Sequence, residues 1–208
     1  MKRLHRADMF QWSAFDEARD LDFHGTLIAL PTGNVAIDPM PLSDHDAAHI
    51  ASLGGVGWVN ISNADHVRAA GDFQARFGAR IGAPAAERGD RAYEGLRIDH
   101  WLEDGELLGC GIRVRAMRGS KTPGELAFVT PEGDTVITGD LVRGHHAGAL
   151  HLLPEPKLSD RAAALASVRA LLELPKLRHV VVGDGFSVFH RGREALLELV
   201  ARETSNEI

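Results

Sequence analysis

The sequence predicts an α/β (α+β) fold in which two β-sheets pack together and helices cover the outside. Three observations lead to this prediction. Short apolar segments with the composition of strands alternate along the chain with amphipathic helical patterns. The order strands, helix, strand, helix occurs twice, although the two halves share no sequence repeat. A sheet must bury a face and a helix must bury a stripe, and packed sheets with helices outside satisfy both requirements.

The composition is that of one globular domain. The chain has 208 residues and a net charge of −6 without a basic stripe, which argues against a nucleic-acid partner. No segment has the length and apolar character of a membrane span. The single cysteine, Cys110, cannot form an internal disulfide, and the N-terminus lacks the apolar core of a signal peptide. We therefore expect a single domain over residues 1–208, located in the cytoplasm, with no membrane partner and an undetermined oligomeric state.

The first half of the chain is expected to begin with residues 10–23 lying over an edge of the core. Residues 26–30 and 34–38 read as two strands of a hairpin with a Pro-Thr-Gly turn. Ser43, with Asp46 three residues later, predicts a capped helix that ends at the glycine pair 54–55. The rest of this half is expected to form a buried strand at 57–61, a helix from about Asp65 to Gly78, and a short strand at 79–83.

The second half repeats this order of elements. Residues 96–101 and 106–117 read as strands, and residues 125–140 read as a hairpin turned by the segment Pro-Glu-Gly-Asp. Apolar residues on one face predict a helix over residues 159–174. The continuous apolar run at 179–182 is typical of a strand buried on both faces. A last helix is expected to pass through Leu196, Leu197 and Val200.

One stretch, WVNISNADHVRAA at residues 58–70, carries a partial metal-binding signature. It resembles the metallo-β-lactamase superfamily, whose pattern after such a strand is Thr-His-x-His-x-Asp-His. Asp65 and His66 match the end of this pattern, whereas Asn60, Ile61 and Asn63 replace the threonine and the first two histidines. The resemblance covers nearly the whole chain. It implies a four-layer αββα sandwich with two mixed sheets flanked by helices, and the site of a metallo-hydrolase.

The resemblance also assigns roles to residues in other loops. Asp38 matches an early strand-end aspartate that orients the metal ligands, and Asn63 lies among the same supporting residues. Lys121 precedes a Thr-Pro-Gly turn, at a position where the superfamily has a histidine. Asp140 matches the aspartate that bridges two metal ions, and Asp184 stands where the last histidine is expected.

These assignments predict at most one metal ion. The positions of the first metal ion are Ile61, Asn63 and Lys121, which are poor ligands for zinc. The positions of the second metal ion can all coordinate, and their anionic character suits manganese or iron and tolerates zinc. This second set is Asp65, His66, Asp140 and Asp184. We therefore expect one divalent ion (zinc, manganese or iron), or none.

Lys121 has two interpretations. Its ammonium group could replace part of the missing metal charge, pair with Asp140 or Asp184, and polarise a substrate oxygen. In that case Asp65, Lys121 and Asp140 form the catalytic group. Alternatively, Lys121 only forms an ion pair in an inactive site. Both interpretations predict an ion pair with one of the two aspartates.

The segment that follows Asp140 is rich in basic residues. Arg143, His145 and His146 are candidates for binding a small-molecule substrate that carries negative charge, and His151 follows them. We expect at least one of these histidines to face the same cleft as Asp65. The alternative is a solvated loop whose histidines form ordinary hydrogen bonds.

Two functional hypotheses follow. The first is a metal-dependent hydrolase that acts on an ester, thioester, lactone, amide or phosphoester. The second is a catalytically inactive binding or regulatory module that retains the fold, with Lys121 in place of the first metal ion. The sequence does not choose among the substrates.

Overall fold

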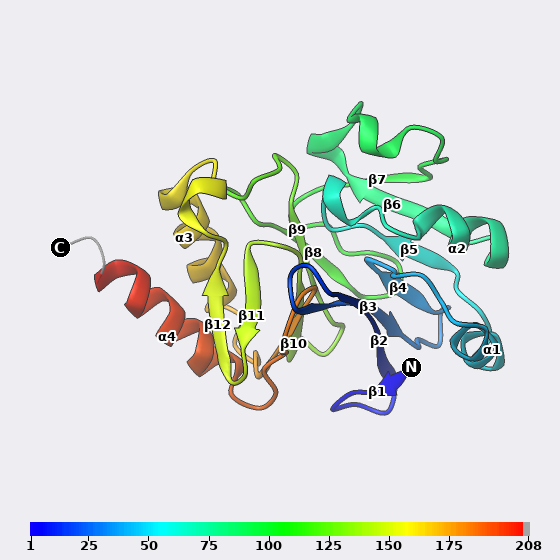
Figure 1. The fold of residues 1–208 in the computed structure, drawn as a ribbon, viewed down its shortest axis with the longest axis horizontal. Helices are drawn as coiled ribbons and strands as arrows, with labels where there is room; N and C mark the ends of the chain where they lie inside the picture. Colours follow the sequence, from blue (N-terminus) through cyan, green and yellow to red (C-terminus); the bar gives the residue numbers. More distant parts are fainter. Residues whose placement is uncertain (206–208) are drawn as a thin grey trace. The chain divides into compact units, whose positions relative to one another are not determined.

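The structure is a computed structural model, and it describes residues 1–205. The chain divides into two compact units, Met1–Leu102 (unit 1) and Glu103–Ile208 (unit 2). The boundary differs from the expected one, because the segment 96–101, which was expected to begin the second half, belongs to unit 1. Figure 1 shows the elements of each unit. The sequence predicted one domain over residues 1–208, and each unit of the structure has its own sheet and core cluster.

Unit 1 contains a mixed seven-stranded sheet with the strands in chain order (Figure 1). Strands β1 to β4 pair antiparallel, and strands β4 to β7 pair parallel. The strands are β1 (Lys2–Arg3), β2 (Met9–Asp16), β3 (Leu21–Ile28), β4 (Val35–Ile37), β5 (Trp58–Asn60), β6 (Arg80–Pro84) and β7 (His100–Leu102). The helical elements are α1 (Asp44–Ser52), η1 (Ala64–His66), α2 (Ala70–Phe77), η2 (Ala85–Glu87) and η3 (Arg91–Tyr93).

One face of the unit 1 sheet is apolar across five strands. Successive register partners on this face are Phe10, Leu27, Ala36, Val59 and Ile81. Helices α1 and α2 contribute apolar side chains to the same cluster of buried residues. These strand residues form the apolar surface on which the two helices pack, so each helix buries its apolar side chains there.

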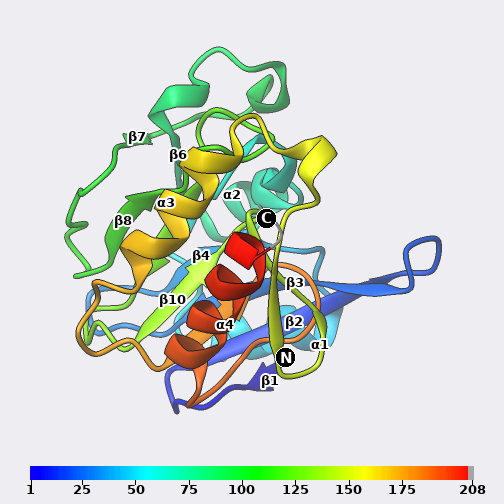
Figure 2. The ribbon, with the colours of Figure 1, turned by 90° about the vertical axis from the view of Figure 1, so that its left-hand side faces the viewer.

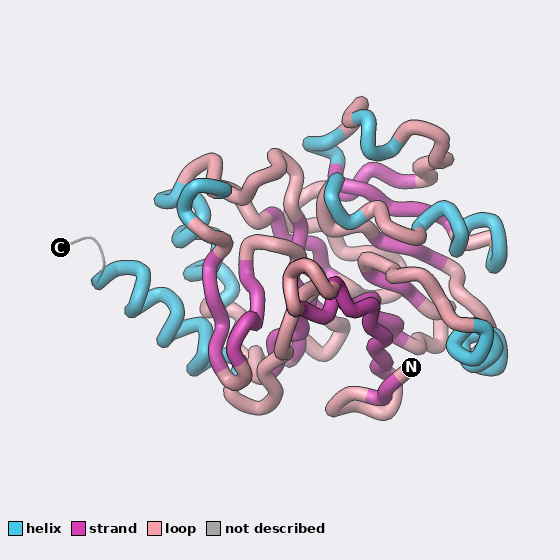
Figure 3. Tube along the Cα trace, in the orientation of Figure 1, coloured by secondary structure: helices cyan, strands magenta, loops and turns pink. Residues whose placement is uncertain are grey.

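Unit 2 contains a mixed four-stranded sheet with the order β13-β10-β9-β8, in which only the β10–β13 pair is parallel. Its strands are β8 (Arg113–Ala116), β9 (Leu126–Val129), β10 (Thr135–Thr138) and β13 (His179–Val182), and β11 (Val142–His146) pairs with β12 (Ala149–Leu152) as a separate hairpin. The helical elements are η4 (Glu155–Lys157), α3 (Arg161–Leu171) and α4 (Gly192–Ser205). Figure 2 views α3 and α4 in front of β10, and Figure 3 separates helix from strand.

The core of unit 2 lies between this sheet and its two long helices. Val129, Val136 and Val180 are register partners, and they belong to one buried cluster with Leu165 of α3 and Leu196 of α4. No helix in residues 1–205 is long and apolar enough to cross a membrane.

Several predicted elements are confirmed. The Ser43 side chain accepts a hydrogen bond from the Asp46 backbone N–H at 3.1 Å, as the N-cap of α1. The hairpin formed by β3 and β4 pairs Thr26 with Ile37. The β9–β10 hairpin is also present, and the apolar run at 179–182 is a fully buried strand.

Four predicted elements are wrong. The strand expected over residues 106–117 is only β8, because residues 106–112 contain a turn with Gly111 at φ +88°. Residues 10–23 form most of the β2–β3 hairpin rather than a cover over an edge, because Phe10 and Trp12 alternate with polar residues as a strand requires. Helix α2 begins at Ala70, since residues 64–66 form a short 3₁₀ turn. The segment after Asp140 is the β11–β12 hairpin rather than a loop, with Gly148 at φ +80° in its turn.

The unit 1 core gives a first prediction. Phe73 of α2 is 1% exposed and stacks on Trp12 with ring centroids 5.8 Å apart. We expect Phe73→Ala to lower the free energy of unfolding by about 3–5 kcal/mol, because it leaves a cavity in the apolar face. Urea denaturation measures the change, and Phe15→Ala, at a site that is 58% exposed, is the matched control. Equal effects of the two substitutions would contradict the packing described above.

Candidate functional site

In unit 2, two predicted metal ligands meet at the ends of parallel strands. Thr138 of β10 and Val182 of β13 are register partners, and Asp140 and Asp184 each follow two residues later. The carboxyl ends of parallel strands share one edge of a sheet, which brings the two aspartates together. Both are almost fully buried, with side chains that are 6% and 2% exposed. Two buried carboxylates repel each other unless a cation lies near them.

Two cations compensate the charge of these carboxylates. The Arg143 guanidinium lies 2.9 Å from Asp140 Oδ1 and 3.3 Å from Asp184 Oδ2, and its side chain is 10% exposed. Lys121 Nζ lies 2.9 Å from Asp140 Oδ2, so both oxygens of Asp140 contact a cation. The ion pair predicted between Lys121 and Asp140 is therefore confirmed. Arg143, a candidate for substrate binding, is buried in this network, and its contact with a substrate stays a prediction.

A buried glutamate, which the sequence analysis missed, supports both ends of the ion pair. Glu125 is 1% exposed, and its Oε1 accepts a hydrogen bond from the Leu141 backbone N–H at 2.6 Å. Its Oε2 accepts a hydrogen bond from the Ser120 hydroxyl. Leu141 is adjacent to Asp140 and Ser120 is adjacent to Lys121, so Glu125 holds the two loops that carry the ion pair. Its position directly after the Thr-Pro-Gly turn was the available signal.

The histidines of the β11–β12 hairpin divide between two environments. His145 Nε2 lies 3.4 Å from Asp184 Oδ2, which places one of these histidines beside a predicted ligand. His146 packs edge-on against His151 with ring centroids 5.0 Å apart. Desolvation lowers the pKa of His151, with a further contribution from the positive charge of Arg202. The expected position of this hairpin beside Asp65 stays a prediction.

In unit 1, a second strand-end aspartate holds His66. Asp38 follows β4, and its Oδ2 lies 2.7 Å from His66 Nδ1. Ser62 donates hydrogen bonds to Asp38 from its backbone N–H at 2.7 Å and from its hydroxyl at 2.6 Å. Asp38, Ser62 and His66 are each at most 3% exposed. Asp38 therefore orients His66, as the resemblance implies.

The other nitrogen of His66 contacts an arginine that the sequence analysis did not single out. Arg68 Nη2 lies 3.0 Å from His66 Nε2, and Arg68 Nη1 donates to the backbone carbonyls of His24 at 2.8 Å and Asp38 at 3.1 Å. A guanidinium only donates hydrogen bonds and a carboxylate only accepts them. These partners assign the proton to Nδ1 and the lone pair to Nε2, so His66 is neutral.

The other predicted residues of unit 1 lie at the same strand end. Asn63 is buried and caps η1, because its Oδ1 accepts a hydrogen bond from the Asp65 backbone N–H at 3.0 Å. Asp65 lies in that turn and is exposed. Asp65 and His66 belong to unit 1, and Asp140 and Asp184 belong to unit 2. The convergence of all four residues in one site stays a prediction.

The arrangement within each unit does not fit a bound metal ion. Neither unit, over residues 1–205, has three or more His, Cys, Asp or Glu side chains grouped so that they could hold a metal. The nitrogen of His66 that would coordinate accepts a hydrogen bond from Arg68 instead. Both oxygens of Asp140 contact cations, and Asp184 Oδ2 faces Arg143. Asp184 Oδ1, in contrast, is buried and has no hydrogen-bond partner within the described chain.

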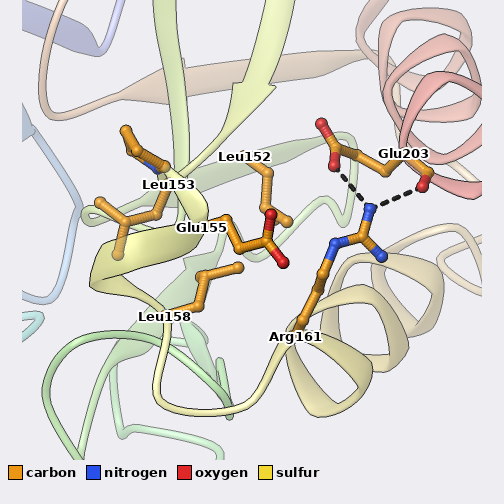
Figure 4. Close-up of a pocket in the computed structure, with 7 residues that line it drawn as sticks. Leu152, Leu153, Glu155, Leu158, Arg161 and Glu203 are labelled. Carbon is orange, nitrogen blue, oxygen red and sulfur yellow. Dashed lines mark hydrogen bonds and ion pairs between the residues drawn. The ribbon is translucent and has the colours of Figure 1, made fainter. Parts of the chain in front are cut away.

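A separate cavity of unit 2 contains none of the predicted site residues. It has a volume of about 320 Å³, and Figure 4 shows Leu152, Leu153 and Leu158 along its apolar part. Arg161 and Glu203 contribute an ion pair of 3.0 Å to its polar part. The charge network at Asp140 is therefore distinct from this cavity.

A family model matches most of this chain, and solved structures share its fold. A family model described as the metallo-beta-lactamase superfamily matches residues 1–203. The metallo-beta-lactamase from Pontibacter korlensis is 16% identical with a TM-score of 0.74, over 94% of this chain and 96% of that chain. The metallo-beta-lactamase family protein TTHA1429 from Thermus thermophilus is 18% identical with a TM-score of 0.71, over 96% of this chain and 80% of that chain.

TTHA1623, solved in a di-iron-bound form, is 24% identical with a TM-score of 0.65, over 88% of this chain and 96% of that chain. A comparison with curated protein sequences gives no match. The structural similarities confirm the predicted fold class, that of the metallo-β-lactamase superfamily.

The charge network gives a second prediction. We expect Arg143→Ala to lower the free energy of unfolding by about 3–5 kcal/mol, because two buried carboxylates lose the cation between them. Lys121→Ala should cost less, about 1–3 kcal/mol, because Asp140 keeps its contact with Arg143. The control is Arg191→Ala, whose ion pair with Glu198 is exposed and contributes about 0–1 kcal/mol. Urea denaturation after treatment with chelator measures the free energy of unfolding of all three variants. If Lys121→Ala has the same free energy of unfolding as wild type, the ion pair of Lys121 adds no stability.

The hairpin gives a third prediction, on pH. Because the pKa of His151 is lower in the folded protein than in the unfolded chain, the folded state binds this proton more weakly. Its contribution to stability is therefore complete above about pH 6.5, the value of an ordinary histidine, and is lost as the pH falls below it. Thermal melts from neutral to acidic pH should show a smaller decrease for His151→Gln than for wild type. His45→Gln, which removes an exposed histidine, should melt like wild type at each pH.

Proposed function

Because this chain belongs to the metallo-β-lactamase superfamily and fills its predicted metal positions with its own cations, we propose that it is a binding or regulatory module without a metal centre. One observation carries the proposal. Lys121, Asp140, Arg143 and Asp184 form a continuous chain of ion pairs in unit 2. Lys121 and Arg143 supply the positive charge that a metal ion would otherwise supply.

The charges of these four side chains favour a particular kind of ligand. Two carboxylates and two cations sum to zero, so the network has no excess charge to attract a polyanion. His145 is about one-third exposed beside Asp184 and offers a polar contact at the surface. The buried, unpartnered Asp184 Oδ1 is an acceptor for a hydrogen-bond donor. We therefore propose a small polar ligand, uncharged or zwitterionic, that donates at least one hydrogen bond.

A second candidate is a hydrolase with one divalent metal ion (zinc, manganese or iron), held by Asp65, His66, Asp140 and Asp184. The unpartnered Asp184 Oδ1 favours it, because a buried acceptor without a partner can mark the place of an ion. The neutral His66, with its lone pair on Nε2, favours it as well. TTHA1623, a structural neighbour, was solved in a di-iron-bound form. The substrate of this candidate would be an ester, thioester, lactone, amide or phosphoester.

Metal content separates the two candidates and is the fourth prediction. Protein purified without a polyhistidine tag and without chelator should contain far less than one equivalent of zinc, manganese or iron, because its donor atoms already contact cations. Chelator should leave its melting temperature unchanged. Elemental analysis and a thermal melt measure the two quantities.

One equivalent of metal in the wild type, lost in Asp184→Asn, would contradict the proposal and support the hydrolase. Two tightly bound ions would contradict both candidates. A panel of ester, thioester, lactone, amide and phosphoester substrates, assayed with and without each metal, completes the test. Turnover that depends on added metal would also overturn the proposed function.

A further inference from the structure

The cavity of unit 2 that lies apart from the ion-pair network has the size of a small-molecule site. It is found where the end of β12, the turn that carries η4, the first residue of α3 and the last turn of α4 come together (Figure 4). Its volume of about 320 Å³ is at the lower end of the range of about 300–1,000 Å³ that is usual for ligand sites. An occupant would therefore be small.

Leucine side chains form an apolar wall that is fixed in place. Leu152 and Leu153 are 8% and 1% exposed and belong to the buried core cluster of unit 2, and Leu158 packs against that cluster. The η4 turn is closed by a hydrogen bond from the Leu158 backbone N–H to the Glu155 carbonyl at 3.0 Å. Because core packing and this turn hold the wall, a ligand can bury an apolar chain against it without first ordering the protein.

The polar part of the cavity has more negative than positive charge. Arg161 Nη2 donates to the Glu203 backbone carbonyl at 2.6 Å and to Glu203 Oε2 at 3.0 Å, so these two side chains neutralise each other. That carbonyl belongs to the last turn of α4, the end of a helix that carries partial negative charge. Glu155 is exposed, and its carboxylate has no ion pair or hydrogen bond within residues 1–205. Lys157, in the same turn, does not line the cavity, which leaves the charge of Glu155 uncompensated there.

We propose that this cavity binds a small aliphatic ammonium, with its alkyl chain along the leucines and its charged head at Glu155. Figure 4 shows the Glu155 side chain beside the apolar wall, on the side of the cavity where Arg161 lies. An anionic molecule of the same size would meet two carboxylates and an arginine that Glu203 already neutralises. An uncharged molecule would keep the apolar contact but lose the ion pair. The inference rests on residues that the proposed function does not use, so each can fail alone.

Titration with pentylammonium chloride, followed by NMR of the full-length chain with ¹³C-labelled leucine methyl groups, tests the inference. The methyl resonances of Leu152, Leu153 and Leu158 should shift and reach saturation at millimolar ligand. 1-Pentanol has the same chain without the charge, and it should bind about two- to fivefold more weakly, the change expected when an exposed ion pair is lost. Sodium pentanoate, which reverses the charge, should give no saturable shift.

Glu155→Gln identifies the anionic partner. It should weaken the binding of pentylammonium about two- to fivefold and leave that of 1-pentanol unchanged, because only the charged ligand uses the carboxylate. Glu173→Gln is the matched control, since Glu173 is also exposed in unit 2 but does not line the cavity, and it should bind both ligands as wild type does. Leu158→Trp, which fills the cavity from its apolar wall, should abolish the binding of both ligands.

Three outcomes would overturn the inference: no saturable shift of these leucine methyl groups with pentylammonium, pentanoate that binds as tightly as pentylammonium, or a Glu155→Gln variant that binds pentylammonium as wild type does. Shifts confined to residues of the ion-pair network would mean that the ligand binds elsewhere, with the same consequence. If Leu158→Trp fails to fold, Glu155→Gln still decides, because it changes only an exposed side chain.

Discussion

The organisation of unit 2 depends on the repulsion between two buried carboxylates and on the cation between them. The parallel pairing of β10 with β13 brings Asp140 and Asp184 to one sheet edge, where neither is solvated. Arg143 contacts both, and the backbone around it is built for close approach. Gly144 and Gly185 pair across a β-bridge, and a Cβ on Gly144 would lie 2.0 Å from the Phe186 carbonyl oxygen. The aspartates, the arginine and the two glycines therefore form one interdependent arrangement.

In unit 1, a buried carboxylate and an arginine also lie beside a predicted metal ligand, His66. The parallel β4–β5 pair places Asp38 beside the segment that carries His66, and the charge of Asp38 is shared with the His66 ring and two donors from Ser62. Arg68, two residues after His66, covers the remaining nitrogen. In each unit an arginine comes from the chain immediately after a predicted metal ligand. Lys121 of unit 2, by contrast, lies far from Asp140 in the sequence, so the network of unit 2 also joins distant segments.

Apolar periodicity and turn residues were sufficient to predict sheets covered by helices. The resemblance to the metallo-β-lactamase superfamily, rather than periodicity, gave the positions of the aspartates. The sequence also predicted that Lys121 would pair with an aspartate. It could not predict the role of Arg143 or Arg68, since an arginine in a polar segment is equally compatible with solvent exposure. The β11–β12 hairpin was missed because Val142–His146 lacks a clear alternation of polar and apolar residues. The role of Glu125 could not be predicted either, because it depends on a hydrogen bond with Leu141, 16 residues away, which leaves no local pattern in the sequence.

A tethered cation preserves the charge of a metal ion but not its chemistry. A metal ion has vacant coordination positions and lowers the pKa of bound water, which provides a nucleophile at neutral pH. A guanidinium has no vacant coordination position and stays protonated at every pH at which the protein is folded. It can neutralise Asp140 and Asp184 and can orient a bound molecule, but it cannot generate hydroxide. If arginine and lysine take the place of a metal ion here, as proposed, they would neutralise the carboxylates at the strand ends without activating water, and for this reason we propose binding rather than hydrolysis.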